Sequence, residues 1–160
     1  MATIRVSPTF LKPRSYLNLL KINLFNRQRD LPIDLKAVRK SISLFLAYKK
    51  VFSGEVTVHF VTKRAICKLH AQFFNDPTPT DCISFPYAQE KEAFDPMLGE
   101  VFVCPKVAEE YDPENPQAEI ILYIVHGLLH LLGYDDQDKK ERARMRRAEK
   151  AALQLLKLCN

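Results

Sequence analysis

The stretch HGLLHLLGYDD, from His126 to Asp136, sets two histidines four residues apart and follows them with a glycine and two aspartates. Residues four apart on a helix lie above one another on the same face, so both imidazoles can point at one metal ion. A chain that turns at Gly133 can bring Asp135 or Asp136 back as a third ligand. The pattern therefore predicts a metal site at the end of a helix.

The helix expected to carry these histidines, residues 117–132, is apolar almost all round, which places it in the middle of the core. Two imidazoles in a core have few protein partners to share, whereas a divalent cation satisfies both, so we favour a metal over hydrogen-bonded core histidines. Gly127 costs about 1 kcal/mol of helix stability relative to alanine, which indicates a close backbone approach or room for a ligand. It also occupies the position of the glutamate base of HExxH zinc peptidases, which argues against peptidase chemistry.

Length and composition indicate one globular domain without a membrane span. The chain has 160 residues, 47% of them hydrophobic, and no run of about eighteen apolar residues. The absence of a CxxC pair and of a secretory signal favours a reducing, intracellular environment. The four cysteines are Cys67, Cys82, Cys104 and Cys159.

The net charge of +5 is unevenly distributed along the chain. Residues 137–160 carry eight basic side chains against three acidic ones, whereas residues 81–119 carry two against ten. A basic surface on the N-terminal part and the last helix suits a polyanionic partner such as RNA. Solvated helix faces without a partner explain the same charges.

Hydrophobic periodicity and turn residues predict alternating strands and helices without internal repeats. The order indicates an α+β domain with a small mixed sheet and one buried helix packed on it. The expected strands span residues 16–25, 55–61, 82–85 and 99–104, and the expected helices span residues 32–50, 63–74, 105–110, 117–132 and 138–158.

Three blocks of the sequence resemble the YbeY family, the metal-dependent endoribonucleases of bacterial rRNA maturation. Residues 79–86, PTDCISFP, resemble the family's PTDVLSFP, and residues 98–101, LGEV, resemble its LGDI strand. The three blocks occur in the family's order. The family pattern HGxLHLxGYDH is matched at His126, Gly127, Leu129, His130, Leu131, Gly133, Tyr134 and Asp135.

The resemblance implies a single YbeY-like domain over residues 1–160, with residues 1–14 as an irregular N-terminal extension. Its expected fold is a four-stranded mixed sheet packed with a central metal-binding helix and flanking helices. It implies one divalent ion, zinc above others, at the mouth of a cleft. The implied substrate is single-stranded RNA near the 3′ end of the small-subunit rRNA, the implied partners are the ribosome or small-subunit assembly factors, and the location is the cytoplasm.

Two residues depart from the family pattern. Asp136 stands where the family has its third ligand, a histidine, so the expected metal ligands are His126, His130 and Asp136. A carboxylate lowers the charge of the site, which weakens the ion as a Lewis acid and suits a harder metal as well. Phe74 stands where the family places an arginine that can clamp phosphate, and Phe74 can only stack or pack. Nearby Lys63, Arg64 and Lys68 either replace that arginine or are solvated helix charges.

Further site residues follow from the same blocks. Asp135 either orients a ligand imidazole or forms a turn or cap before the last helix. Thr80, Asp81 and Ser84 either line the cleft or are only turn and strand-end residues. No residue stands out as a general base, and catalytic residues are left unassigned.

The expected function is metal-dependent endonucleolytic hydrolysis of single-stranded RNA in rRNA processing and ribosome assembly or quality control. The ion is expected to activate water and to polarise a phosphoryl oxygen. One alternative is a catalytically weak or inactive assembly or RNA-binding factor that keeps the metal site. Another alternative is a metal-dependent hydrolase of a different substrate.

Overall fold

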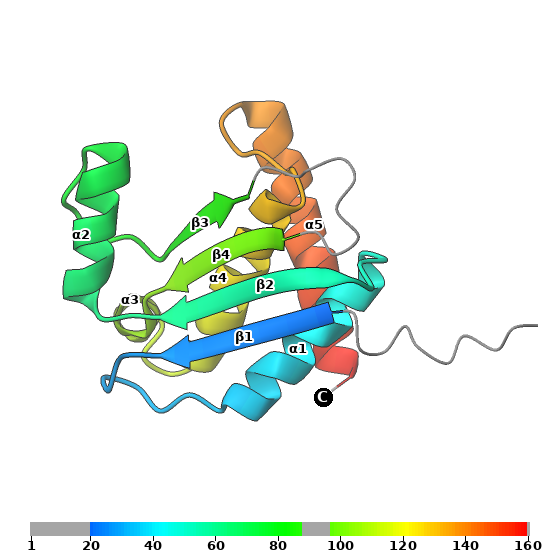
Figure 1. Cartoon of the computed structure of the whole chain (residues 1–160), viewed down its shortest axis with the longest axis horizontal. Helices are drawn as coiled ribbons and strands as arrows, with labels where there is room; N and C mark the ends of the chain where they lie inside the picture. The colour runs from blue at the N-terminus through cyan, green and yellow to red at the C-terminus, as the bar shows by residue number, and fades with distance from the viewer. Residues whose placement is uncertain (1–19, 88–96, 160) are drawn as a thin grey trace, which may run out of the picture.

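The computed structural model describes residues 20–87 and 97–159 (Figure 1). Four strands and five helices make up this part of the chain. In chain order they are β1 (Leu20–Asn26), α1 (Leu35–Tyr48), β2 (Gly54–Phe60), α2 (Lys63–Phe74), β3 (Cys82–Pro86), β4 (Met97–Val103), α3 (Pro105–Tyr111), α4 (Pro116–Leu131) and α5 (Lys139–Leu158).

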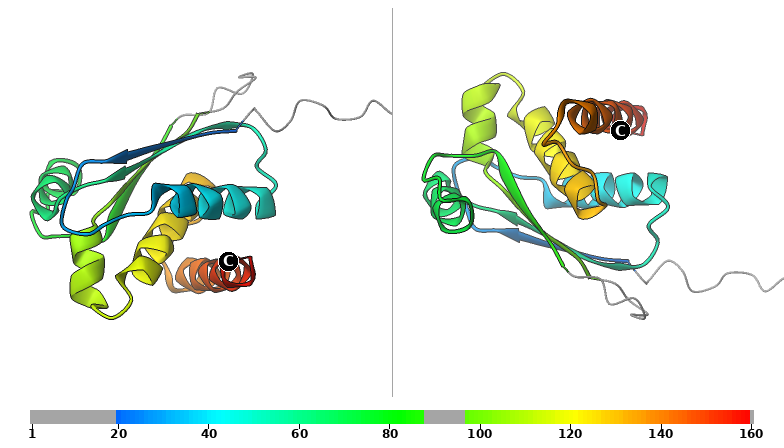
Figure 2. Two further views of the ribbon diagram at one scale, coloured as in Figure 1. Left: turned by 90° about the horizontal axis from the view of Figure 1, so that it is seen from below. Right: turned by 90° about the horizontal axis from the view of Figure 1, so that it is seen from above.

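The strands form one mixed sheet in the order β1-β2-β4-β3. Strands β1, β2 and β4 are parallel, and β3 runs antiparallel to β4 at the edge. Parallel neighbours need crossover connections, and α1 supplies the one between β1 and β2. Figure 2 shows α1, α4 and α5 together on one face of the sheet, whereas α2 lies at one end of it.

The core lies between this helical layer and the inward side chains of the two central strands. Val56, Val58 and Phe60 alternate along β2 and are fully buried, as period-2 patterning requires. Val101 and Val103 of β4 continue the same buried layer. The sheet therefore presents an apolar floor to α4.

Helix α4 occupies the centre of the molecule, as its sequence predicts. Asn115 caps its first turn by accepting from the backbone N–H of Ala118, and Pro116 occupies the first turn, where a missing N–H costs nothing. The helix contacts two strands and three other helices. Its buried residues are Ile120, Tyr123, Ile124, Val125, Gly127, Leu128, Leu129 and Leu131.

Gly127 marks the closest approach of α4 to the sheet. A Cβ atom at this position would lie 2.5 Å from Cγ1 of Val101, closer than any real carbon contact. Val101 is fully buried in β4 and has no room to move away. The glycine therefore allows the helix to sit directly on the strand, which explains its presence beside the first histidine.

The α+β class and the four-stranded mixed sheet with a central helix are confirmed. The predicted strand 99–104 instead spans Met97–Val103. It begins earlier because Met97 already pairs with Glu55. It ends earlier because Cys104 is the N-cap of α3, which begins at Pro105. Residues 16–19 of the first expected strand, the expected extension 1–14 and the loop 88–96 lie outside the described residues. The single-domain assignment over residues 1–160 stays a prediction.

Candidate metal centre

His126 and His130 lie one turn apart near the C-terminal end of α4 and turn their rings toward each other. Their Nε2 atoms are 3.0 Å apart. About a quarter of each side chain is exposed, so both imidazoles can be reached from solvent although the helix itself is buried. The predicted pairing of the two histidines on one helical face is present.

The other ring nitrogen of each histidine contacts a hydrogen-bond acceptor. Nδ1 of His126 lies 2.6 Å from Oε1 of Glu149, and Nδ1 of His130 lies 3.0 Å from the carbonyl oxygen of Tyr134. Because these partners are acceptors, each Nδ1 donates to its partner, which leaves Nε2 as the ring atom that can bind a metal. The two Nε2 atoms converge on one point, so the arrangement fits a metal ion.

Asp136 completes a group of three ligand atoms. Its Oδ2 lies 3.8 Å from Nε2 of both histidines, and one ligand atom from each residue lies within 4.8 Å of the others. Tetrahedral zinc with bonds of about 2.0–2.1 Å places its ligand atoms about 3.3 Å apart. The observed separations bracket that value, so the three residues fit a zinc-sized ion.

The loop after α4 delivers the aspartate. Gly133 has φ +88°, a left-handed conformation that glycine adopts without strain, and the N–H of Tyr134 donates to the carbonyl of Leu129 to close the turn. Oδ1 of Asp135 accepts from the backbone N–H groups of Asp136 and Gln137. This Asx-type turn fixes the chain beside the histidines, and the suggested orienting role of Asp135 stays a prediction.

Tyr134 is itself held by two cations. Its hydroxyl accepts from Nζ of Lys49 at 3.0 Å, and that ammonium and the guanidinium of Arg144 lie 4.8 and 4.6 Å from the centroid of its ring. The bond to Lys49 lowers the pKa of the Tyr134 hydroxyl. The residue whose carbonyl orients His130 is therefore anchored to α1 and α5.

Glu149 is the partner that sequence reasoning missed. It lies on α5, 23 residues after His126, among basic residues that invite no such role. The available signal is its place in the buried stripe Met145, Ala152 and Leu156, because residue 149 has the same helical spacing. A carboxylate in the apolar stripe of a basic helix needs a buried partner, and here that partner is a histidine.

Electrostatics couple these groups. The hydrogen bond to Glu149 raises the pKa of His126, with the negative charges of Glu149, Asp81 and Asp136 acting in the same direction. Desolvation and the neighbouring carboxylates raise the pKa of the Cys82 thiol well above its ordinary value. The thiol therefore stays protonated, and the negative charge of the site resides on carboxylates.

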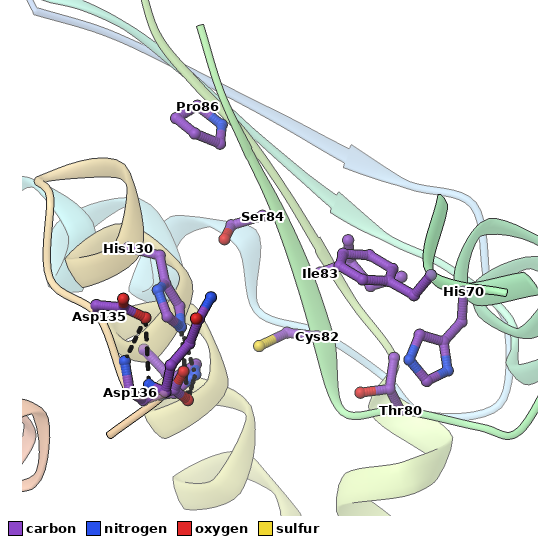
Figure 3. Close-up of a pocket in the computed structure, with 12 residues that line it drawn as sticks. His70, Thr80, Cys82, Ile83, Ser84, Pro86, His130, Asp135 and Asp136 are labelled. Atoms are coloured by element: carbon purple, nitrogen blue, oxygen red, sulfur yellow. Dashed lines mark hydrogen bonds and ion pairs between the residues drawn. The ribbon is translucent and has the colours of Figure 1, made fainter. Parts of the chain in front are cut away.

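A cleft of about 390 Å³ opens beside the three ligand residues (Figure 3). Ser84 and Cys82 point into it from β3, opposite His130 (Figure 3). The side chains around it are His70, Phe74, Thr80, Cys82, Ile83, Ser84, Pro86, His126, His130, Asp135, Asp136 and Gln137.

The three residues expected to line the cleft, Thr80, Asp81 and Ser84, divide into two groups. Thr80 and Ser84 line the cleft, in the places expected for them. Asp81 turns its carboxylate to the chain instead, accepting from the backbone N–H of Cys82 at 2.7 Å and from the hydroxyl of Thr80 at 3.1 Å. Asp81 thus fixes the start of β3, and its expected place in the cleft stays a prediction.

The described residues that line the cleft include no lysine or arginine. Nζ of Lys63 is paired with Glu110 at 2.5 Å, and Arg64 and Lys68 are exposed on α2 away from the lining side chains. Phe74 does line the cleft and is 57% exposed.

Comparisons with known proteins identify the family of this chain. A sequence model of the family described as "Endoribonuclease YbeY" matches residues 23–157. A protein from Protochlamydia amoebophila named Endoribonuclease YbeY is 43% identical over 131 residues, which cover 80% of this chain and 87% of that protein. One of the same name from Chlamydia trachomatis serovar D is 40% identical over 141 residues, covering 85% and 88%.

The fold agrees with a solved structure as well. The solution structure of a protein from Thermotoga maritima superimposes with a TM-score of 0.58 at 26% identity, covering 86% of this chain and 89% of that one. The segment matched by the family model, residues 23–157, contains the whole of α4, the loop after it and Glu149. With the family match and the close relatives both spanning most of its length, this chain belongs to the YbeY family.

Proposed function

We propose that the protein is a zinc-dependent endoribonuclease that hydrolyses single-stranded RNA during maturation of the 3′ end of small-subunit rRNA. The observation that carries this proposal is the convergence of the Nε2 atoms of His126 and His130 beside Asp136 at the edge of a cleft, in a chain whose relatives are named endoribonucleases. We further propose a role in ribosome assembly or quality control, with small-subunit assembly factors as partners and the cytoplasm as the location.

In this proposal His126, His130 and Asp136 hold the ion, which when bound supplies a Lewis acid that activates water and polarises a phosphoryl oxygen. Glu149 and the carbonyl of Tyr134 keep the ring protons on Nδ1, so that both Nε2 atoms remain free to bind the ion. Three protein ligands are typical of catalytic zinc sites, which keep a position for water or substrate.

A basic surface next to the site supports RNA as the substrate. Arg146, Lys150 and Lys157, here called the α5 flank, are exposed on one side of α5 and line a hollow of about 360 Å³ together with Glu149. Glu149 also contacts His126, so the flank adjoins the metal centre. Cations in such a row bind successive phosphates of a nucleic acid backbone.

A binding factor without catalytic activity is the second candidate. It is favoured by the cleft itself, since its described lining has Phe74 and no lysine or arginine to stabilise a phosphoryl transition state. The carboxylate of Asp136 acts in the same direction because it weakens the ion as a Lewis acid.

Cleavage of a single-stranded rRNA fragment separates these candidates. Metal-loaded protein is expected to cut the fragment internally, and His126→Ala is expected to lose both the ion and the activity. Glu109→Gln, which changes a carboxylate of α3 that pairs with Lys106, should cleave as the wild type does. RNA binding without cleavage under any divalent metal supports the binding factor, and unchanged cleavage by His126→Ala contradicts the proposed mechanism.

A further inference from the structure

The wall of the cleft formed by α2 is aromatic. Phe74, at the end of α2, lines the cleft, and its ring centroid lies 5.5 Å from that of His70 with the rings tilted by 50°. His70 is fixed in turn, because its Nδ1 lies 2.8 Å from the carbonyl oxygen of Thr78. The two rings therefore form a held aromatic surface rather than a loose pair of side chains.

Phe74 contributes little to the packing of the fold. Its neighbour Phe73 is also half-exposed, but the ring of Phe73 packs edge-on against Phe85 of β3 at 4.7 Å. Among the described residues, the ring contact of Phe74 is with His70 alone. More than half of a large apolar side chain thus faces solvent inside a functional cleft, where burial by a ligand is favourable.

Apart from the proposed metal ion, the described lining of the cleft has few groups that hold a phosphate. It offers hydroxyl groups from Thr80 and Ser84 but no lysine or arginine. Proteins that bind single-stranded RNA combine backbone contacts with aromatic side chains on which bases stack. The volume of about 390 Å³ falls within the range of roughly 300–1,000 Å³ found for small-ligand pockets.

We propose that Phe74, supported by His70, is a stacking site for one unpaired nucleobase of the RNA substrate, held across the cleft from the metal ligands. This inference rests on the proposed function, since it assigns a subsite to the same RNA. Stacking requires only the flat face of a base, so the subsite accepts all four bases with a modest preference for those that stack most strongly.

The test uses single-stranded RNA that carries one 2-aminopurine at successive positions, mixed rapidly with metal-loaded protein so that binding precedes cleavage. Wild-type protein is expected to quench the probe at one position. Phe74→Leu keeps an apolar side chain but removes the ring, and should weaken RNA affinity roughly 5- to 150-fold and abolish that quenching. Phe74→Tyr should retain both, and the matched control Phe73→Leu, at a ring outside the lining of the cleft, should leave both unchanged.

A substrate that lacks the base at the quenched position adds a second readout. Wild-type protein should bind it as weakly as Phe74→Leu binds the intact RNA, and the two changes together should cost no more than either alone. If Phe74→Leu binds the intact RNA as tightly as the wild type does, the stacking site is overturned. The same holds if Phe74→Leu reduces the affinity equally for the intact RNA and for the RNA that lacks the base.

The outcomes separate this inference from the proposed function. Quenching that depends on Phe74, without cleavage, supports the stacking site and contradicts the nuclease. Cleavage that is insensitive to Phe74→Leu contradicts the stacking site and leaves the nuclease. A wild-type protein that neither binds nor cleaves the RNA contradicts both.

Discussion

Glu149 should control how tightly the protein binds zinc, although it is not itself a ligand. Its Oε1 accepts the Nδ1 proton of His126 at 2.6 Å, and only 17% of the carboxylate side chain is exposed. Glu149→Gln keeps the size of the side chain and an acceptor oxygen but removes the charge. The variant therefore isolates the electrostatic contribution of this contact to the metal centre.

The size of the effect follows from this contact. A hydrogen bond to a charged group contributes about 1.5–3 kcal/mol, and each 1.4 kcal/mol is a factor of ten in an equilibrium constant. Loss of the group that orients a ligand histidine typically weakens metal binding by about 10- to 100-fold. We expect the zinc dissociation constant of Glu149→Gln to rise by about tenfold at neutral pH, and that of Glu149→Ala to rise further.

The pH dependence gives the prediction a second signature. Because Glu149 raises the pKa of His126, a proton competes with the ion at a higher pH in the wild type than in Glu149→Gln. The affinity ratio between the two proteins should therefore be largest above the raised pKa and shrink on acidification. In the metal-free protein, the contribution of Glu149 to the free energy of unfolding has the opposite pH dependence. Because the pKa of His126 is raised, this contribution is full below the ordinary pKa of histidine and is lost as the pH rises through the raised value.

Competition with a chromophoric chelator measures these constants. The control is Glu109→Gln, which removes a carboxylate of α3 that pairs with Lys106 and not with a histidine. Its zinc affinity should equal that of the wild type. Zinc affinity of Glu149→Gln within twofold of the wild type at every pH refutes the claim that Glu149 prepares His126 for the metal.

Three further predictions concern packing, ligand identity and RNA binding. Gly127→Ala should lower the free energy of unfolding by about 1–3 kcal/mol in urea denaturation, because its Cβ clashes with Val101, and Val101→Ala in the same chain should restore part of that loss. Asp136→His should keep stoichiometric zinc and raise the cleavage rate, since a neutral ligand makes the ion a stronger Lewis acid; a slower enzyme that retains its zinc contradicts this. Alanine at all three positions of the α5 flank should weaken RNA binding and reduce the slope of log affinity against log salt by up to about 2. Alanine at Lys140 and Arg147, on the outer side of α5, should change neither the affinity nor the slope.

Much of the fold follows from local patterns in the sequence. The apolar run of α4, the alternation along β2 and the proline at the start of α3 each specify an element without reference to the rest of the chain. The pairing of His126 with His130 is equally local, because four residues return a helix to the same face. Gly133 also predicts the turn after the helix, but the residue pattern alone left Asp135 and Asp136 both open as the third ligand, and the resemblance to the YbeY family selected Asp136.

The supporting contacts depend on how distant elements dock, and local patterns do not contain that information. Glu149 reaches His126 only because α5 packs across α4, and Tyr134 is held by Lys49 from α1, 85 residues earlier in the chain. Gly127 was expected to mark a close approach or a ligand, and the position of Val101 decides for the approach. The orientation of the Asp81 carboxylate, by contrast, is set by its contacts with its sequence neighbours Thr80 and Cys82.

The central claim is that His126, His130 and Asp136 bind one divalent ion. Elemental analysis of freshly purified protein tests it most directly, with His126→Ala, His130→Ala and the control Glu109→Gln prepared in parallel. We predict one zinc ion per chain in the wild type and in Glu109→Gln, and a nearly complete loss of zinc in both histidine variants. Metal-free wild-type protein that takes up no added divalent ion, or a stoichiometric ion retained by both histidine variants, contradicts the claim.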